Sequence, residues 1–251
     1  MPISEQDRRN REHWDREADQ YQQLHAQQLN VDEPVWGAWS IPEAELEMLG
    51  EVAGKDVLEL GCGAAQWSIA LAKRGARVVG LDNSGRQLEH ARRLMTEAGV
   101  DFPLMHASAE AVPLPDESFD LVLSDHGALS WCDPHAAAPE AARLLRSGGL
   151  LVFNVASPLT VVCRDPETDQ LDTQLHRSYF ELHLIDEGDG AATYKLSDGD
   201  WIRLLGSNRL TVEAMLELRP HADALTTYED FVPLDWARNW PGEHLWKARK
   251  A

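Results

Sequence analysis

Cysteine, basic side chains and long apolar runs are all scarce in this sequence. Its three cysteines, Cys62, Cys132 and Cys163, are odd in number and have no C-x-x-C spacing. They indicate reduced thiols, because a disulfide framework or a thiolate metal site needs a different pattern. No apolar run approaches the roughly 18 residues of a membrane helix, and the polar start MPISEQDRRNRE lacks the apolar core of a signal peptide. We expect a cytoplasmic protein with no membrane partner.

Basic side chains are outnumbered, since the sequence has 23 Lys and Arg against 42 Asp and Glu and a formal net charge of −19. The acids are dispersed along the chain and form no single tail. Nucleic-acid binding depends on clustered Lys and Arg that release counterions, so we expect no nucleic-acid partner. With 251 residues and no internal repeat, the chain is long enough for one large α/β domain and short for two.

The most informative segment is residues 56–82, DVLELGCGAAQWSIALAKRGARVVGLD. A β-branched and leucine run precedes Gly61 and Gly63, an apolar stretch at helical spacing follows, and a second strand-like run ends at Asp82. Glycines at such a turn let backbone amides approach a ligand, and the carboxylate can accept hydrogen bonds from ribose hydroxyls. A plain tight turn with a helix-capping acid is the alternative. A dinucleotide fingerprint would need a third glycine where Gln66 stands.

The rest of the chain predicts strands and helices that alternate around a parallel sheet. Helices are expected at 4–29, from 42 onward, at 84–99, 133–148 and 198–208, and strands at 102–106, 119–123, 149–157, 210–220 and 243–250. Asp133 caps the helix at 133–148 and Gly148 ends it. Five parallel strands followed by a hairpin would leave the last strand antiparallel, in a mixed sheet with helices on both faces.

We expect a single domain, residues 1–251, with four parts. Residues 1–49 form an N-terminal helical lid, residues 50–156 a cofactor-binding core, residues 157–197 an inserted lid or substrate segment, and residues 198–251 a C-terminal helix and hairpin. The insertion is placed after the fifth strand because the alternation of strand and helix stops there and the sequence becomes acidic and poorly periodic.

Four stretches, VLELGCGAA, VVGLDNS, AEAVPLPDESFDLVLS and LLRSGGLLVFNV, resemble the motifs of class I S-adenosylmethionine-dependent methyltransferases, in particular the type 11 methyltransferase domain. The resemblance is strong over residues 50–156 and weak over the C-terminal hairpin. It implies a doubly wound, Rossmann-like sheet of seven mostly parallel strands, with the last strand antiparallel. It also implies the cofactor S-adenosyl-L-methionine, which leaves as S-adenosyl-L-homocysteine.

The resemblance implies cofactor contacts from Tyr21, Glu59, Gly61, Cys62, Gly63, Asp82, Asn83, Gln87, Ser108, Ala109, Glu110 and Ser124. Glu59 and the glycine turn would hold the methionine and ribose parts, and Asp82 would hold both ribose hydroxyls. Tyr21 corresponds to an aromatic side chain that covers the methionine end in many relatives. Packing of a helix face is the alternative for this tyrosine.

The adenine contacts rest on the same resemblance. Asn83 and Gln87 correspond to the adenine face, and residues 108–110 correspond to the adenine edge. Two positions depart from the family pattern, because Ala65 stands where a third glycine is usual and Ser108 stands where an aspartate is usual. One extra methyl group takes little space, so we expect the turn to be retained. A serine hydroxyl can still make one hydrogen bond to the adenine edge.

Methyl transfer from a sulfonium is an in-line displacement, so alignment of the acceptor with the methyl group supplies most of the acceleration. A hydroxyl or protonated amine acceptor also needs a group that takes its proton. His126, with Asp125 beside it, follows the strand at 119–123 on the ligand side of the sheet and is the candidate base. A structural histidine is the alternative. His176 and His183 are weaker candidates, and their spacing is not that of a metal pair, so we expect no metal.

Aromatic side chains are the remaining clue, since nine tryptophans are many for this length. Trp36, Trp39 and Trp131 lie outside the expected strands and are predicted to line the acceptor pocket, with core packing as the alternative. We therefore predict a methyltransferase that acts on a small-molecule acceptor, at oxygen or nitrogen more readily than at carbon, as a monomer or homodimer. The alternatives are an NAD(P)-dependent oxidoreductase and a non-catalytic cofactor-binding module that regulates a partner.

Overall fold

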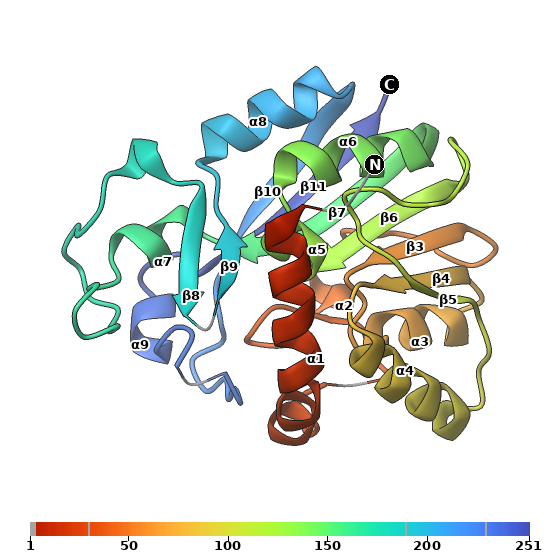
Figure 1. Ribbon diagram of the computed structural model, residues 1–251, viewed down its shortest axis with the longest axis horizontal. Coiled ribbons are helices and arrows are strands. Elements are labelled where there is room, and N and C mark those ends of the chain that lie inside the picture. The colour runs from red at the N-terminus through yellow and green to blue at the C-terminus, as the bar shows by residue number, and fades with distance from the viewer. Residues whose placement is uncertain (1–3, 30, 189, 229) are drawn as a thin grey trace.

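Buried runs of β-branched and leucine side chains form the central strands of the protein. The structure is a computed structural model that describes residues 4–29, 31–188, 190–228 and 230–251, so residues 1–3 and 30 of the predicted lid and residue 189 of the predicted insertion lie outside it. Seven strands form one sheet (Figure 1). From one edge to the other they are β10 (Leu210–Leu218), β11 (Glu243–Lys250), β7 (Leu145–Ala156), β6 (Phe119–Asp125), β3 (Asp56–Leu60), β4 (Arg77–Asp82) and β5 (Leu104–His106).

The directions of the strands agree with the expectation. Strands β7, β6, β3, β4 and β5 run parallel, and Leu58 of β3 is aligned with Val79 of β4 and Val122 of β6. The last strand, β11, is antiparallel to both of its neighbours, β7 and β10. The prediction of a doubly wound, mostly parallel seven-stranded sheet with an antiparallel last strand is confirmed.

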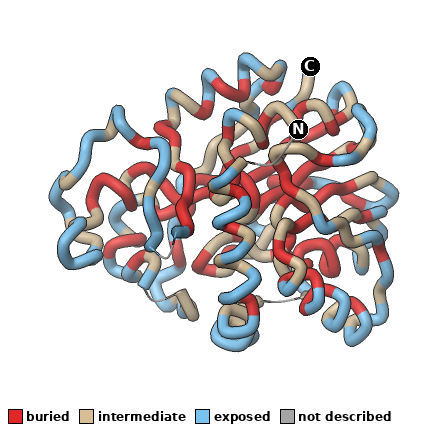
Figure 2. The backbone as a smooth tube through the Cα atoms, viewed as in Figure 1, coloured by how far each residue is buried: buried red, intermediate tan, exposed pale blue. Residues whose placement is uncertain are grey.

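Helices cover both faces of the sheet, because its strands are apolar on both sides. The flanking helices are α3 (Gln66–Lys73), α4 (Gly85–Ala98), α6 (Pro134–Leu144) and α8 (Asp198–Ser207). Val57 belongs to the core cluster that includes the buried side chains of α3 and α4, whereas Leu58, the next residue, belongs to the cluster with α6 and α8. The buried backbone in Figure 2 follows the sheet and the inner sides of these helices. The fold is therefore a three-layer sandwich.

Some element boundaries differ from the prediction. The helix expected to end at Gly148 ends at Leu144, because Leu145 already adopts extended backbone and pairs with β6. Gly148 lies within β7 with a φ of +79°. Strand β6 continues to Asp125, so Ser124 belongs to the strand instead of following it. In both places, pairing with a neighbouring strand overrides the local signal.

Short elements connect the main ones. They are β1 (Val35–Trp36), β2 (Ile41–Pro42), α2 (Glu43–Leu46), α5 (Ala128–Trp131), α7 (Pro158–Val162), the 3₁₀ turn η1 (Tyr179–Glu181) and α9 (Leu234–Ala237). The helix expected from Pro42 onward is only the single turn α2, because Glu47 ends it in the left-handed region. Among the described residues, no helix has the length and apolar character needed to cross a membrane.

Helix α1 (Glu5–His25) lies between the sheet and the inserted segment, residues 157–197 (Figure 1). Within that segment, β8 (Leu184–Gly188) and β9 (Ala191–Tyr194) form an antiparallel hairpin. Asn10 of α1 is fully buried and fixes the hairpin, since its Nδ2 donates to the carbonyl of Ala192 at 2.8 Å and its Oδ1 accepts the N–H of Ala192 at 2.9 Å. The helix thus links the core to the insertion.

Candidate active site

A cavity of about 530 Å³ lies at the sheet edge where β3, β4 and β6 end. Parallel α/β sheets bind their ligands at this edge. The cavity is lined by residues of α1, of the turns after β3 and β4, of the end of β6 and of the inserted segment. Of the residues predicted from the sequence, those at its wall are Tyr21, Glu59, Gly61, Cys62, Gly63, Asp82, Asn83, Gln87, Ala109, Asp125, His126 and Trp131.

The glycine turn after β3 packs closely against its surroundings. Gly61 has a φ of +74°, and a Cβ there would lie 2.3 Å from the backbone nitrogen of Ala128, so no larger residue fits. Gly63 has a φ of +52° and donates its N–H to Oδ2 of Asp82 at 2.8 Å. Ala65 also has a positive φ, +62°, where a residue with a Cβ is disfavoured by about 1 kcal/mol relative to glycine. The turn is retained, and the departure at Ala65 appears as backbone strain.

Two buried carboxyl groups, Asp82 and Glu59, face the cavity. Oδ1 of Asp82 accepts the N–H of Ser84 at 2.8 Å, while Oδ2 accepts that of Gly63. Burial raises the pKa of Asp82 to about 6. Oε2 of Glu59 accepts the N–H of Ser68 at 2.9 Å, and burial raises the pKa of Glu59 to about 8. A ligand that brings hydroxyl donors or a positive charge would stabilise the ionised form of both groups.

Helix α1 covers this end of the cavity through side-chain hydrogen bonds. Gln22 donates to Oε1 of Gln87, and Gln66 donates to Oε1 of Gln22, each at 3.0 Å. The hydroxyl of Tyr21 lies 2.7 Å from that of Tyr228, near the C-terminal part of the chain. Gln66 stands where a dinucleotide fingerprint has its third glycine. Its side-chain amide instead binds helix α1.

Three side chains assigned to the cofactor, those of Ser108, Glu110 and Ser124, are not among the described residues that line the cavity, so their cofactor contacts stay predictions. Oγ of Ser108 accepts the N–H of Glu110 at 3.0 Å, and the carboxylate of Glu110 accepts hydrogen bonds from Ser4. Ser124 is buried within β6, where its hydroxyl has no partner in the described part of the chain. Local capping and the alternation of the strand turn these side chains away from the cavity. Cys62 does line it, but burial raises the pKa of its thiol, which disfavours the reactive thiolate.

The tryptophans divide between core and cavity. Trp36 is fully buried, with its ring 4.3 Å from that of Trp67, and Trp39 is 7% exposed. Neither lines the cavity, so their predicted pocket role is corrected; the core offers their large apolar surface more contact. Trp131 does line the cavity, and its ring meets that of Trp14 edge-on at 4.9 Å.

Four polar side chains, Asp125, His126, Asn154 and Glu243, meet beside the cavity. Nε2 of His126 lies 2.5 Å from Oε1 of Glu243. Nδ2 of Asn154 donates to Oε1 of Glu243 and to Oδ1 of Asp125, both at 2.9 Å. The N–H of Gly37 donates to Oδ2 of Asp125 at 3.1 Å. These bonds connect the ends of β6, β7 and β11 to the loop that precedes α2.

The electrostatics of this group centre on His126. Burial lowers the pKa of His126, but the hydrogen bond and the charge of Glu243 raise it, and the net shift is upward. His126 in turn holds the pKa of Glu243 below its usual value in spite of burial. The side chain of His126 is 31% exposed, and its Nδ1 makes no hydrogen bond with the residues that the structure describes. This ring can therefore exchange a proton with a molecule in the cavity.

Sequence reasoning missed Glu243 and Asn154. Glu243 is 117 residues from His126, and only the pairing of β11 with β7 brings the two together. The one signal was an acid at the head of an otherwise apolar and basic strand, EHLWKARK. That signal has no meaning until the neighbour of the strand is known.

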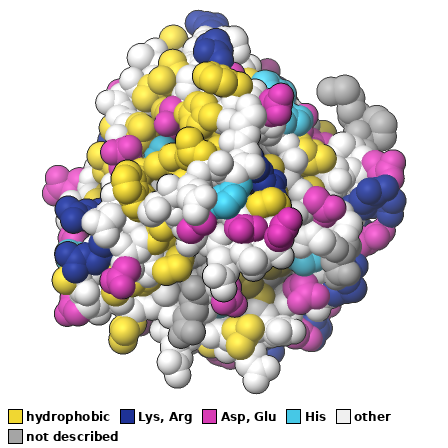
Figure 3. Space-filling model, turned by 90° about the vertical axis from the view of Figure 1, so that its left-hand side faces the viewer, with side chains coloured by type: hydrophobic (Ala, Val, Ile, Leu, Met, Phe, Trp, Pro, Cys, Tyr) yellow, Lys and Arg dark blue, Asp and Glu magenta, His cyan; other side chains and the backbone are white. Residues whose placement is uncertain are grey.

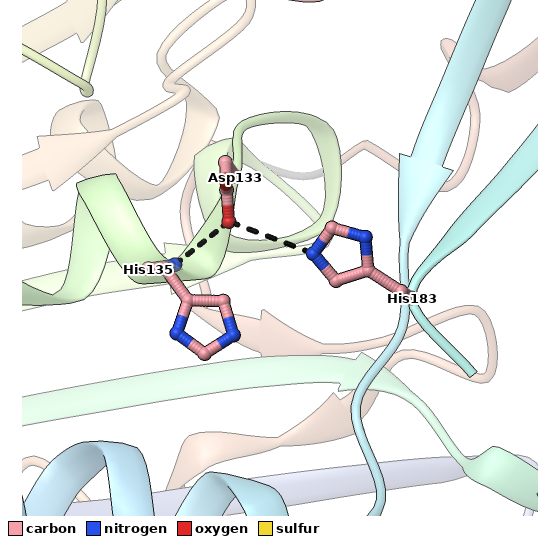
Figure 4. Close-up of side chains that lie close together, drawn as sticks. All are labelled: Asp133, His135 and His183. Atoms are coloured by element: carbon pink, nitrogen blue, oxygen red, sulfur yellow. Dashed lines mark hydrogen bonds and ion pairs between the residues drawn. The ribbon is translucent and has the colours of Figure 1, made fainter. Parts of the chain in front are cut away.

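A second polar cluster consists of Asp133, His135 and His183 (Figure 4). These residues are not among those that line the cavity. Oδ1 of Asp133 accepts the backbone N–H of His135 at 2.9 Å and lies 3.9 Å from Nε2 of His183. Ligand atoms of the three side chains lie within 4.8 Å of one another, a separation at which a metal ion could be held. The absence of a metal stays a prediction. His176, the other weak candidate, lies 3.1 Å from Asp172.

Comparison with known sequences finds methyltransferases as relatives. Residues 58–153 match a family model described as a methyltransferase domain. An uncharacterised methyltransferase of Mycobacterium tuberculosis is 36% identical over 115 residues, which are 46% of this chain and 45% of the relative. A ubiquinone biosynthesis O-methyltransferase of a Ruegeria species is 33% identical over 110 residues, or 44% of each chain. The chain thus spans less than half the length of these curated relatives.

Among solved structures, the fold is similar to that of geranyl diphosphate C-methyltransferase from Streptomyces coelicolor, in a complex with Mg²⁺, geranyl diphosphate and S-adenosyl-L-homocysteine. The TM-score is 0.70, the alignment covers 100% of both chains, and the sequence identity is 16%. At this identity the likeness concerns the fold, including the strands that end at the cavity.

Proposed function

Since residues 58–153 match a family model described as a methyltransferase domain, we propose that this protein transfers the methyl group of S-adenosylmethionine to an oxygen or nitrogen atom of a small-molecule acceptor. One observation carries the proposal. A single continuous cavity is lined by Asp82 and the glycine turn and also by His126. Cofactor and acceptor would therefore share one space, as in-line transfer requires.

The residues of the glycine-turn end fit the cofactor. Each oxygen of Asp82 accepts one backbone N–H and keeps a lone pair for a ribose hydroxyl. Glu59 is buried, has no basic partner among the described residues, and its pKa is raised to about 8, so an ammonium group would supply a positive charge beside it. Tyr21 and Gln87 line the same space from α1 and α4. When bound there, S-adenosylmethionine supplies a methyl group on a positively charged sulfur.

His126 is proposed as the general base for an acceptor that loses a proton from oxygen or nitrogen. In its neutral form, Nε2–H donates to Glu243 and leaves the lone pair of Nδ1 for the proton of the acceptor. Glu243 then stabilises the imidazolium that results. Asp125 acts indirectly, because Asn154 bridges its carboxylate to that of Glu243. The named relatives include one that methylates oxygen and one that methylates carbon, and the open imidazole nitrogen is what supports oxygen or nitrogen here.

The proposal is tested by incubating the protein with methyl-labelled S-adenosylmethionine and, in separate reactions, with the small-molecule fraction and the macromolecular fraction of a cell extract. The expected result is label in a small molecule, which mass spectrometry then identifies. Calorimetry with S-adenosyl-L-homocysteine measures cofactor binding in the same preparation. If the cofactor does not bind, or if no small molecule gains label while a macromolecular fraction does, the proposal is wrong.

The two alternatives differ from it in measurable ways. An NAD(P)-dependent oxidoreductase would be stabilised against heat by a nicotinamide nucleotide and not by S-adenosyl-L-homocysteine, because only a ligand of the folded state raises the melting temperature. A non-catalytic module would bind the cofactor and yield no methylated product with any extract. Labelled product excludes it.

A further inference from the structure

Three basic side chains of the inserted segment, Arg164, Arg177 and Lys195, line the cavity that His126 also lines. In a chain with a net charge of −19, this is an unexpected place for three cations. The face that carries the insertion shows Asp and Glu side chains spread among hydrophobic ones (Figure 3). The same cavity is lined by four exposed acids, Asp169, Asp186, Glu187 and Asp230. It is also lined by the partly buried Asp125, whose carboxylate already accepts hydrogen bonds from Asn154 and Gly37.

Lys195 and Arg164 are the more enclosed of the cations. Lys195 is only partly exposed, and its ammonium makes no hydrogen bond or ion pair with the residues that the structure describes. Arg164 donates to the carbonyls of Asp169 and Phe231, each at 2.7 Å, which fix the guanidinium without cancelling its charge. Arg164 forms an ion pair with the carboxylate of Asp169, with 3.7 Å between the nitrogen and oxygen atoms, and the side chain of Asp169 is 88% exposed. Water screens so exposed a partner strongly.

The position of Lys195 is set by the hairpin. Its N–H donates to the carbonyl of His183 at 2.7 Å, which continues the ladder beyond β9. Asn10 holds β9 against α1, so the lysine is fixed relative to the core. Burial lowers the pKa of Lys195, Glu187 raises it, and Arg164 lowers it further. Lys195 and His126 line the same cavity, and the charge of Lys195 lowers the pKa of His126.

We propose that the acceptor carries an oxyanionic group, a carboxylate or a phosphate, which binds Lys195 and Arg164 beside His126. This inference rests on the proposed function and names the class of its acceptor. An oxyanion in the cavity would supply a negative charge that water screens less than it screens the exposed Asp169 and Glu187, through charge-assisted hydrogen bonds. The exposed acids around it would repel a large polyanion, which favours a small acceptor with one such group. Trp131 and Phe231 line the same cavity and offer apolar surface to the rest of the molecule.

The test uses protein saturated with S-adenosyl-L-homocysteine and three probes of similar shape, namely benzoate, phenyl phosphate and the neutral benzamide. Calorimetry should show at least one anion binding about tenfold or more tightly than benzamide, the range expected for a charge-assisted hydrogen bond. Comparison of benzoate with phenyl phosphate distinguishes a carboxylate from a phosphate. Lys195→Met and Arg164→Gln should each remove most of this preference, and Lys55→Met, outside the cavity, should leave it intact.

Equal affinity for benzamide and the anions would overturn the inference, and so would full anion preference in Lys195→Met or no binding of either anion. The binding of S-adenosyl-L-homocysteine and the melting temperature are measured for each variant, so that misfolding is recognised. Failure of the wild-type protein to bind S-adenosyl-L-homocysteine would instead count against the proposed function. The two failures are therefore distinct.

Discussion

At the scale of single residues, the proposed roles of His126 and Glu243 predict that the rate of methyl transfer depends on pH. The carboxylate of Glu243 raises the pKa of His126 above its ordinary 6.5, and a protonated imidazole cannot accept a proton. We expect kcat/KM to rise with pH through the His126 pKa. Glu243→Gln removes the negative charge and should move this inflection to lower pH. Once a labelled product identifies the acceptor, pH–rate profiles of both proteins check the expectation.

His126→Ala should lower kcat by about 10²–10⁴-fold, the usual contribution of a general base, and leave the affinity for S-adenosyl-L-homocysteine nearly unchanged. His221→Ala is the matched control, since that histidine is 65% exposed and pairs with Glu45 at the surface. If the pH–rate profile of Glu243→Gln is the same as that of the wild type and His126→Ala retains full turnover, the histidine has a structural role.

Asp82 should control cofactor affinity. Its two oxygens accept the N–H groups of Gly63 and Ser84, so Asp82→Asn places an amide donor against one of them and removes an acceptor. We expect the Kd for S-adenosyl-L-homocysteine to rise about 10–100-fold. Because the pKa of Asp82 is raised to about 6, the wild type should lose affinity as the pH falls through that value. Calorimetry at several pH values checks both effects, with the exposed Asp101→Asn as control.

Site residues that belong to a local motif could be predicted from the sequence. Site residues that meet only through tertiary structure could not. Gly61, Gly63 and Asp82 follow from the order of strand, turn, helix and acid along one short segment. Glu243 reaches His126 only because β11 inserts beside β7. Trp36 shows the opposite error, because a tryptophan in a Pro- and Gly-rich loop suggests a surface pocket, whereas the loop folds it into the core.

At the scale of elements, the attachment of the hairpin to the lid helix depends on Asn10. Its side chain is fully buried and bonds the N–H and carbonyl of Ala192 and the carbonyl of Trp131. Asn10→Leu leaves these backbone groups unpaired, so we expect a loss of about 2–4 kcal/mol in the free energy of unfolding. Hydrogen exchange at the Ala192 amide should accelerate. Asn239→Ala, at an exposed site, should change stability by about 0.5 kcal/mol or less.

The type of an element was predictable from the sequence where its residue pattern agrees with the strand pairing in the structure. Boundaries were not predictable where the pattern and the strand pairing conflict. Helix α4 begins after the Ser84 cap and ends at Gly99, as its sequence indicates. Helix α6 stops before its glycine, because Leu145 is taken into β7. The insertion gave no periodic signal, since the hairpin of β8 and β9 is held by contacts to α1 and α5, which lie far away in the sequence. Its cations therefore became meaningful only in the structure.

At the scale of the whole molecule, β11 joins the C-terminal hairpin to the parallel strands, and Trp246 lies at the centre of this junction. Trp246 is 1% exposed, and its ring lies parallel to that of Phe153, 6.2 Å away. Trp246→Ala should lower the free energy of unfolding by about 3–5 kcal/mol, the cost of removing a large buried aromatic side chain. For a chain of this size, that corresponds to a melting temperature lower by roughly 6–20 °C.

The matched control is Trp240→Ala, because Trp240 is 48% exposed and its loss should cost about 0.5 kcal/mol or less. Denaturant unfolding of both variants is followed by circular dichroism and by the binding of S-adenosyl-L-homocysteine. If the sheet, the lid and the cavity form one cooperative unit, the two signals lose amplitude together in Trp246→Ala and their midpoints shift equally. A binding signal that persists after the circular dichroism signal of the C-terminal hairpin, β10 and β11, is lost would show that the parallel strands fold without β11. Glu243 would then reach His126 from an element whose stability is separate from that of the parallel strands.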